Sequence, residues 1–179
     1  MKKVTMGESA VIETERLWLR QFKPTDAGFI VELLNSPAWL EFIGDRNVRT
    51  EEDALAYLLN GPIKSYDANG FGLFLVLLKE SDLPIGACGL LKRDFLDEPD
   101  LGFAFLPDYI GLGYGLESAK SVMNFAARDL NLPKVLAFTV PQNVASIKLL
   151  EKLGFTFEKI FKMPEEDEEL FLFCYQSVA

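Results

Sequence analysis

Histidine is absent from this sequence of 179 residues, and its absence removes several kinds of active site. Neither a Ser-His-Asp triad nor a Cys-His pair can be assembled, and zinc sites that contain histidine are excluded as well. Cysteine is scarce, because only Cys88 and Cys174 occur, far apart and without a C-x-x-C pair. We expect both to be buried, reduced thiols, as is usual in a cytosol.

Basic residues are outnumbered, with 18 Lys and Arg against 27 Asp and Glu, a net charge of −9 and a pI near 4.6. This balance argues against nucleic acid as a partner, because no basic patch could release enough counterions. The acidic surface favours cationic partners such as amines or basic peptides. The alternative is that it serves solubility alone.

Long hydrophobic runs are missing too. No run approaches the roughly 20 residues of a membrane span, and the stretch before Glu8 and Glu13 lacks the apolar segment of a signal peptide. We therefore expect a soluble, cytoplasmic protein without a membrane partner. A hydrophobic content of 49% is enough for one domain over residues 1–179, with residues 1–11 as a flexible tail.

The hydrophobic pattern predicts a mixed α/β (α+β) fold. Strands are expected at 16–22, 71–78, 85–91, 101–106, 134–140, 155–161 and 170–175. Helices are expected at 24–34, from 50 to about 59 with a restart after Pro62, at 116–130 and at 143–153. This order, β-α-α-β-β-β-α-β-α-β-β, predicts a mostly antiparallel sheet of about seven strands with helices on both faces.

The strand at 101–106 has two unlike faces. Leu101, Phe103 and Phe105 alternate with Gly102 and Ala104, so one face is bulky and the other small. We expect a ligand or another chain segment to lie against the small face.

Glycine stands at alternate positions directly after this strand, at Gly111, Gly113 and Gly115. Glycines allow the backbone to approach a ligand, and the helix that follows presents unpaired N–H groups and its positive dipole end. The segment is typical of a phosphate cradle. A glycine-rich turn between two elements is the alternative.

Two stretches, LPDYIGLGYG at 106–115 and PQNVASIKLLEKLGF at 141–155, closely resemble the GNAT superfamily of acyl-CoA-dependent N-acetyltransferases. The segment IETERL at 12–17 looks like the RimJ/RimL-like branch, which acetylates the N-termini of ribosomal proteins. The resemblance extends from about Ile12 to the C-terminus. It implies a GNAT-like sheet that is splayed between its fourth and fifth strands.

The resemblance also implies acetyl-CoA as the co-substrate, without a metal. Its pyrophosphate would be bound by backbone N–H groups of Ile110, Gly111, Leu112, Gly113, Tyr114 and Gly115. Its pantetheine arm would pair with the fourth strand at Phe103, Ala104 and Phe105, where an N–H near Phe105 would polarise the thioester carbonyl. The family often carries Gln or Arg at position 110 and a basic residue or Gln at 112, so a weaker affinity for CoA is expected here.

Asn143 and Ser146 stand three residues apart at a helix start and can share one face. The resemblance implies that Asn143 binds the pantetheine and that Ser146 donates a proton to the leaving thiolate. Tyrosine is the commoner donor in the superfamily. Helix capping without any catalytic role is the alternative for both residues.

Asp100 matches a position where relatives often carry an acidic residue, and it could accept the amine proton directly or through water. The alternative is an exposed loop charge within the cluster of Asp94, Asp97, Glu98 and Asp100. The first helical region shapes the acceptor pocket in the family, and its aromatic residues are pocket or core side chains: Trp39, Phe42 and Tyr66. The acidic run 165–169 is either a solvated turn or a recruiter of a basic acceptor.

The sequence therefore predicts an N-acetyltransferase that acts on a primary amine by direct attack in a ternary complex. The favoured acceptor is the N-terminal amine of a protein or peptide. The alternatives are a small amine, such as a polyamine, aminoglycoside or amino acid, or a CoA-binding regulatory module without turnover. The protein is expected to be a monomer or a homodimer.

Overall fold

The computed structural model of the chain describes residues 10–164 and 167–176. Its strands are β1 (Ala10–Glu13), β2 (Leu17–Gln21), β3 (Leu73–Leu78), β4 (Pro84–Leu91), β5 (Asp100–Phe105), β6 (Lys134–Thr139), β7 (Thr156–Phe161) and β8 (Leu170–Gln176). Its helices are α1 (Ala27–Leu34), α2 (Pro37–Phe42), α3 (Glu51–Asn60), α4 (Pro62–Asn69), α5 (Tyr114–Arg128) and α6 (Val144–Lys152). Short 3-10 turns, η2 (Pro24–Asp26) and η3 (Pro107–Tyr109), precede α1 and follow β5.

The strands form an 8-stranded sheet in the order β1-β2-β3-β4-β5-β6-β8-β7, in which β5 and β6 are parallel and the other pairs antiparallel. The predicted mixed, mostly antiparallel fold is confirmed. The sheet has one strand more than expected, because Ala10–Glu13 form β1, which pairs with β2, although residues 10 and 11 were predicted to belong to a tail. The rest of the predicted tail, residues 1–9, lies outside the described residues.

Helix starts follow the local sequence. A capping box precedes α3: Thr50 Oγ1 accepts from the Asp53 N–H at 3.1 Å, and the Asp53 carboxylate accepts from the Thr50 N–H at 3.0 Å. Helix α2 was not predicted, because a proline shortly after an expected helix, as at Pro37, usually marks the end of that helix. Proline also suits the first position of a helix, and here Pro37 starts one.

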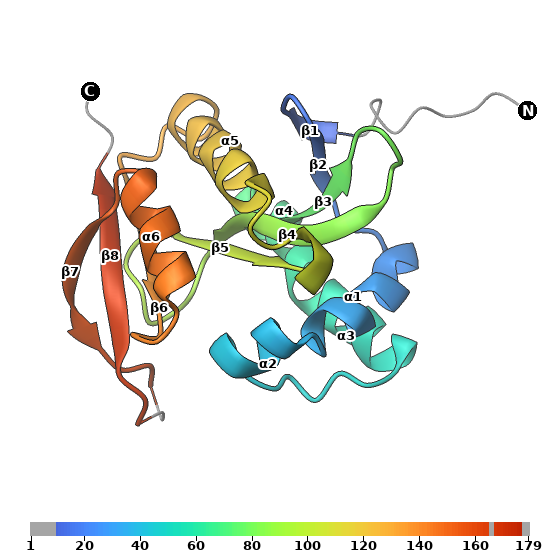
Figure 1. Ribbon diagram of the computed structural model, residues 1–179, viewed down its shortest axis with the longest axis horizontal. Helices are drawn as coiled ribbons and strands as arrows, with labels where there is room; N and C mark the ends of the chain where they lie inside the picture. The colour runs from blue at the N-terminus through green and yellow to red at the C-terminus, as the bar shows by residue number, and fades with distance from the viewer. Residues whose placement is uncertain (1–9, 165–166, 177–179) are drawn as a thin grey trace, which may run out of the picture.

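Apolar side chains of the central strands fill both faces of the sheet, as their continuous runs predict. Phe74 and Val76 of β3 pack beneath α5, whereas Leu75 and Leu77 pack against α1 and α3. In Figure 1, α5 lies above strands β3 to β5, and α1 and α3 lie below them. None of the helices in the part of the chain that the structure describes is long and apolar enough to span a membrane.

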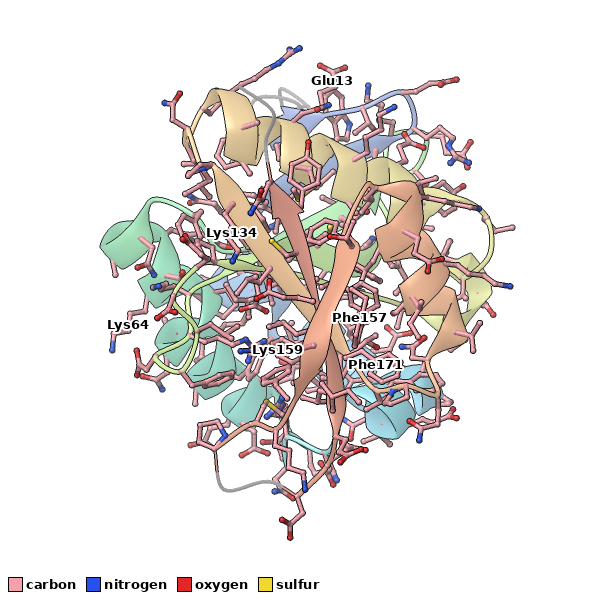
Figure 2. All side chains as sticks on the ribbon, turned by 90° about the vertical axis from the view of Figure 1, so that its left-hand side faces the viewer. Glu13, Lys64, Lys134, Phe157, Lys159 and Phe171 are labelled. Atoms are coloured by element: carbon pink, nitrogen blue, oxygen red, sulfur yellow. The ribbon has the colours of Figure 1, made fainter. Side chains whose placement is uncertain are left out.

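The C-terminal hairpin, β7 with β8, pairs with β6 and extends the sheet on the far side of β5. Figure 2 shows Phe157 and Phe171 on the side of this hairpin that faces α6, and Lys134 and Lys159 on the other side. A small second core, with Leu136 and Leu172, lies on the side of the lysines beneath the loop that contains Leu96. Both cysteines are free and buried, and burial raises the pKa of Cys88 to about 12.

Candidate functional site

The glycine loop lies between η3 and α5, and two of its glycines are required by backbone conformation. Gly111 has φ +81° and Gly113, the N-cap of α5, has φ +87°. Residues with a Cβ adopt this left-handed region at a cost, so glycine is the residue that fits both turns. Open space surrounds the position where a Cβ of Gly111 would lie.

Gly115 was predicted to let the backbone approach a ligand, but in the structure its missing side chain makes room for neighbouring protein atoms. A Cβ at this position would lie 3.1 Å from Leu149 Cδ1 and 3.6 Å from Phe105 Cε2. The absence of a side chain therefore lets the first turn of α5 pack closely against α6 and β5. This contact places the starts of both helices next to the end of β5.

The main-chain amides of residues 111–116 are the feature of the loop that points most directly to an anionic ligand. None of these N–H groups donates to an acceptor among the residues that the structure describes, whereas the Glu117 N–H donates to the Gly113 carbonyl at 3.0 Å. Unpaired amides at the start of a helix attract anions. They fit the pyrophosphate predicted for this loop. Ile110 departs from the prediction, because its N–H already donates to the Pro107 carbonyl at 3.2 Å.

Strands β5 and β6 diverge beside this loop. They share one paired position, Asp100 with Leu136, where the Leu136 N–H donates to the Pro99 carbonyl at 2.9 Å. Further along, β5 stays paired with β4 and β6 stays paired with β8. The splay predicted between the fourth and fifth strands is therefore present, and Figure 1 shows β5 running away from β6.

The pairing of β5 with β4 determines which of its peptide groups face the opening. The Leu106 N–H donates to the Ile85 carbonyl at 2.9 Å, and main-chain groups alternate between the two edges of a strand. Phe103 and Phe105 thus present their N–H and C=O groups towards β6, while those of Ala104 are bonded to β4. Ala104 therefore has no free main-chain group for a pantetheine arm in this geometry, and its place in the cofactor site, where its small side chain would give clearance, stays a prediction.

The small face of β5 is not free at Gly102. A Cβ there would lie 2.7 Å from Leu91 Cδ1, so the side chain of β4 fills the space that was predicted to receive a ligand. The opening beside β5 is therefore at its edge and not on this face.

Helix α6 begins at the same end of the sheet. Asn143 is its N-cap, and its Oδ1 accepts from the Ser146 N–H at 3.1 Å, so the capping interpretation holds. The Asn143 amide nitrogen and the Ser146 hydroxyl have no protein partner among the described residues. Ser146 is half-buried and shares a helix face with Leu149, which contacts Gly115, and with buried Leu150. Ser146 is thus directed towards α5 and β5.

Asp100 is not the exposed loop charge that was one of its two interpretations, because it is only 2% exposed. Its Oδ1 accepts from Arg93 Nε at 2.9 Å, and the Arg93 guanidinium lies 4.9 Å from the centre of the Phe138 ring. Burial raises the pKa of the Asp100 carboxyl above its ordinary value, and Arg93 offsets this only in part. Asp100 lies where β5 and β6 meet, at the closed end of the splay.

Two of the aromatic candidates for the acceptor pocket are core residues. Trp39 is 7% exposed and packs in the core with side chains of α1 and α3. The Tyr66 hydroxyl accepts from the Phe22 N–H at 3.0 Å and donates to the Leu73 carbonyl. Phe42 is half-buried at the end of α2, and its role stays a prediction. Of the acidic run 165–169, residues 165 and 166 lie outside the described residues.

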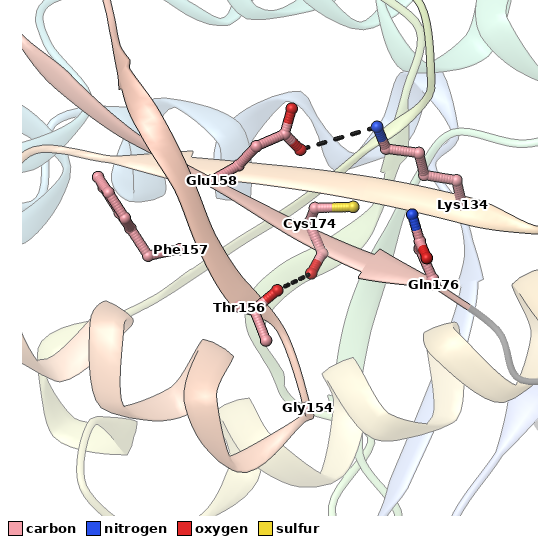
Figure 3. Close-up of a pocket in the computed structure, with 7 residues that line it drawn as sticks. All are labelled: Lys134, Gly154, Thr156, Phe157, Glu158, Cys174 and Gln176. Atoms are coloured by element: carbon pink, nitrogen blue, oxygen red, sulfur yellow. Dashed lines mark hydrogen bonds and ion pairs between the residues drawn. The ribbon is translucent and has the colours of Figure 1, made fainter.

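Two hollows lie away from the loop and the splay. One of about 550 Å³ lies on the face of the C-terminal hairpin in Figure 3, where Lys134 pairs with Glu158 at 3.7 Å and Thr156 Oγ1 donates to the Cys174 carbonyl at 3.4 Å. The other, of about 840 Å³, runs between α3, α4 and the end of β4. Neither is lined by a predicted site residue. Over residues 10–164 and 167–176, no group of three or more His, Cys, Asp or Glu side chains could hold a metal ion.

Arg16 is the residue beside the loop for which the sequence predicted no role. Its Nη1 donates to the Leu112 carbonyl at 3.1 Å, although the two residues are 96 positions apart. The only signal in the sequence was its place in the segment 12–17, which suggested a branch and no contact.

Comparison with known proteins agrees with this geometry. The family described as "Acetyltransferase (GNAT) domain" matches residues 16–156. The uncharacterized N-acetyltransferase YnaD of Bacillus subtilis is 28% identical over 151 residues, covering 84% of this chain and 85% of its own.

Solved structures share the fold. An acetyltransferase from Agrobacterium tumefaciens has a TM-score of 0.79 at 23% identity, covering 93% of this chain and 94% of that one. RimL, a ribosomal L7/L12 alpha-N-protein acetyltransferase solved in complex with coenzyme A, has a TM-score of 0.79 at 16% identity, covering 94% and 98%. The chain belongs to the GNAT acetyltransferase family and is an acetyl-CoA-dependent N-acetyltransferase.

Proposed function

We propose that this enzyme transfers the acetyl group of acetyl-CoA directly to the N-terminal amine of a protein or peptide, within a ternary complex. The observation that carries the proposal is the continuity of two sets of free main-chain groups. The amides of residues 111–116 lead into the open edge of β5, where Phe103 and Phe105 present their peptide groups. A molecule with a diphosphate at one end and an amide-bearing arm would satisfy both sets.

Each part of acetyl-CoA then has a set of partners. The amides of residues 111–116 bind the pyrophosphate, and the peptide groups of Phe103 and Phe105 pair with the pantetheine arm. The Phe105 N–H faces the thioester carbonyl and stabilises the oxyanion that forms when the amine attacks. The main contribution of the protein is to align the amine with the thioester.

Ser146 and Asn143 serve the donor side of the reaction. The Asn143 amide nitrogen, which capping leaves free, donates to a carbonyl of the pantetheine arm. When the carbon–sulfur bond breaks, the Ser146 hydroxyl hydrogen-bonds to the leaving thiolate, the conjugate base of a thiol with a pKa of about 8.5. It passes a proton to the sulfur as it regains one from solvent water, so that no serine alkoxide is left behind.

Asp100 serves the acceptor side. A carboxylate that is 2% exposed cannot meet an amine directly, so a water molecule carries the amine proton to it. Burial raises the pKa of Asp100, which makes the carboxylate a better base than an exposed aspartate.

Three observations support a protein or peptide N-terminus as the acceptor. The segment 12–17 is similar to enzymes that acetylate ribosomal proteins, and the fold is shared with RimL, which is described as an alpha-N-protein acetyltransferase. The net charge of −9 suits a basic protein such as a ribosomal one.

The proposal predicts acetylation at the α-amine. We expect peptides with a free N-terminus to release CoA thiol and to gain one acetyl group by intact mass, with the site located by fragmentation. Matched peptides with a blocked N-terminus and a free lysine, together with spermidine and amino acids, serve as the comparison. A preference for any of these over the free N-terminus would contradict the proposed acceptor.

Gly111→Ala tests whether the loop of residues 111–116 binds the pyrophosphate of acetyl-CoA. Alanine at φ +81° costs about 1–2 kcal/mol, so we expect the loop to shift and the KM for acetyl-CoA to rise about fivefold or more. Gly70→Ala is the matched control, because Gly70 has φ +76° and open space around it but ends α4. Both variants should lose similar stability in urea unfolding. An equal KM in the two variants would rule out a cradle at Gly111.

Ser146→Ala tests the proton donor. We expect kcat to fall by about tenfold or more while the KM for acetyl-CoA stays close to that of the parent, because the backbone cap at Asn143 is kept. Ser121→Ala, which removes a hydroxyl that donates to the Ser118 carbonyl within α5, should leave kcat unchanged. A full rate for Ser146→Ala from about pH 6 to 9 would exclude this role.

If Asp100 is the base, kcat/KM should fall at low pH, which gives the pH profile an acid limb. As the pH falls through the raised pKa, the carboxylate gains a proton and can accept no other, so the rate falls. Arg93→Gln removes the cation that lowers this pKa, so the limb should move to higher pH. Asp100→Asn should abolish the limb and lower the rate.

Lys79→Gln is the control for this experiment, because it removes the same charge from a pair with Glu13 elsewhere on the sheet. We expect its profile to match that of the parent enzyme. If Arg93→Gln also leaves the limb in place, Asp100 is not the base.

A further inference from the structure

Arg16 lies in the turn between β1 and β2, and three different parts of its side chain contact the glycine loop and the first turn of α5. Nε donates to Glu117 Oε2 at 2.7 Å, Nη1 donates to the Leu112 carbonyl at 3.1 Å, and the guanidinium lies 4.4 Å from the centre of the Tyr114 ring. The planar fork of arginine makes such simultaneous contacts possible, and lysine has no equivalent.

The turn that carries Arg16 is itself anchored to α5. The Arg16 N–H donates to Glu117 Oε1 at 2.9 Å, and the Thr14 hydroxyl donates to the same oxygen at 2.6 Å. The Leu17 N–H donates to Thr14 Oγ1 at 3.0 Å and closes the turn. Backbone and side chain of this turn thus hold the guanidinium in one place, although it is 43% exposed.

The hydrogen bond from Arg16 to the Leu112 carbonyl fixes the direction of one of the free amides of the loop. A peptide unit has its N–H and C=O on opposite sides, so binding the carbonyl of Leu112 fixes the direction of the Gly113 N–H. The Arg16 Nη2 lies 3.2 Å from the position that a Gly113 Cβ would take, so the guanidinium lies against the loop itself. Arg16 therefore restrains the part of the loop where the free amides lie.

Glu117 introduces a negative charge into the first turn of the same helix. The helix dipole stabilises this charge, but the charge also opposes the binding of a diphosphate at the helix start. Burial works to raise the pKa of Glu117, and hydrogen bonds from Thr14 and Arg16 outweigh it and lower the pKa, so the carboxylate is ionised. The guanidinium of Arg16 cancels that charge beside the loop.

We propose that Arg16 is a positioning residue of the cofactor site, which holds the loop of residues 111–116 with its amides outward and neutralises Glu117 next to the diphosphate. The proposal rests on the diphosphate site of the proposed function. Because the loop side chains Ile110 and Leu112 are apolar, the charge that offsets Glu117 has to come from a distant segment, and Arg16 supplies it.

Arg16→Gln tests the proposal by CoA binding in calorimetry and by steady-state kinetics. We expect the Kd for CoA and the KM for acetyl-CoA to rise about fivefold to tenfold, while kcat changes less than about twofold. The KM for S-acetylpantetheine, which lacks the diphosphate, should not change. Arg128→Gln removes the same charge at the other end of α5 and should leave all values unchanged.

The outcomes separate this inference from the proposed function. An unchanged Kd for CoA in Arg16→Gln, or an equal loss for CoA and S-acetylpantetheine, overturns the role of Arg16. Failure of the parent protein to bind CoA overturns the diphosphate site itself.

If Arg16→Gln does not fold because Glu117 has lost its partner, a second pair of variants tests the same role of Arg16. The double variant Arg16→Gln/Glu117→Gln has neither charge and also lacks the hydrogen bond from Arg16 to the Leu112 carbonyl. We expect it to bind CoA about threefold or more weakly than Glu117→Gln alone. Equal affinities of the two variants for CoA would contradict a role for this hydrogen bond in holding the loop.

Discussion

The separation of two parallel strands, β5 and β6, is the constraint on which the site depends. The strands share one paired position and then leave each other, because β5 remains bonded to β4 and β6 to β8. Polar main-chain groups inside a protein need partners, and those of Phe103 and Phe105 find none across the opening. An amide-bearing ligand would supply the missing partners, which is the physical reason for proposing that the pantetheine arm binds at this edge of β5. The glycine loop and the start of α6 lie at this opening because they directly follow the two strands.

The charge of the whole molecule says little about the charge at this site. A chain with a net charge of −9 must attract a cofactor that carries several phosphate charges, which the surface as a whole repels. Local features oppose this repulsion: the positive dipole end of α5 and the free amides before it, beside which Arg16 neutralises Glu117. Because these groups lie within a few ångströms of the loop, solvent and salt screen them less than they screen distant charges.

Local sequence predicted most of the architecture, since strands, caps and turns depend on neighbours along the chain. The N-cap at Asn143 and the order along the chain of the strands from β2 to β8 were predicted correctly for this reason. Strand β1 and helix α2 are short and have weak patterns, so they were missed.

Errors at the site came from contacts between distant segments. The burial of Asp100 depends on how β4, β5 and β6 meet, the space over Gly102 is filled from β4, and the reason for Gly115 lies on α6. No pattern in the sequence reports these distances. The same holds for Arg16, whose partner at Leu112 lies 96 positions along the chain.

The lack of histidine fits the proposed acceptor better than it fits a lysine side chain or a polyamine. An N-terminal amine has a pKa of about 7.7–8.0, whereas a lysine amine has one of about 10.4. A carboxylate remains a weak base even when burial raises its pKa, as it does for Asp100, so the transfer of a proton from the more acidic amine is less unfavourable. A substantial fraction of N-terminal amines is also neutral near pH 7 to 8 before any base acts. An enzyme that relies on alignment and on a buried carboxylate therefore suits an acceptor that needs little help to lose its proton.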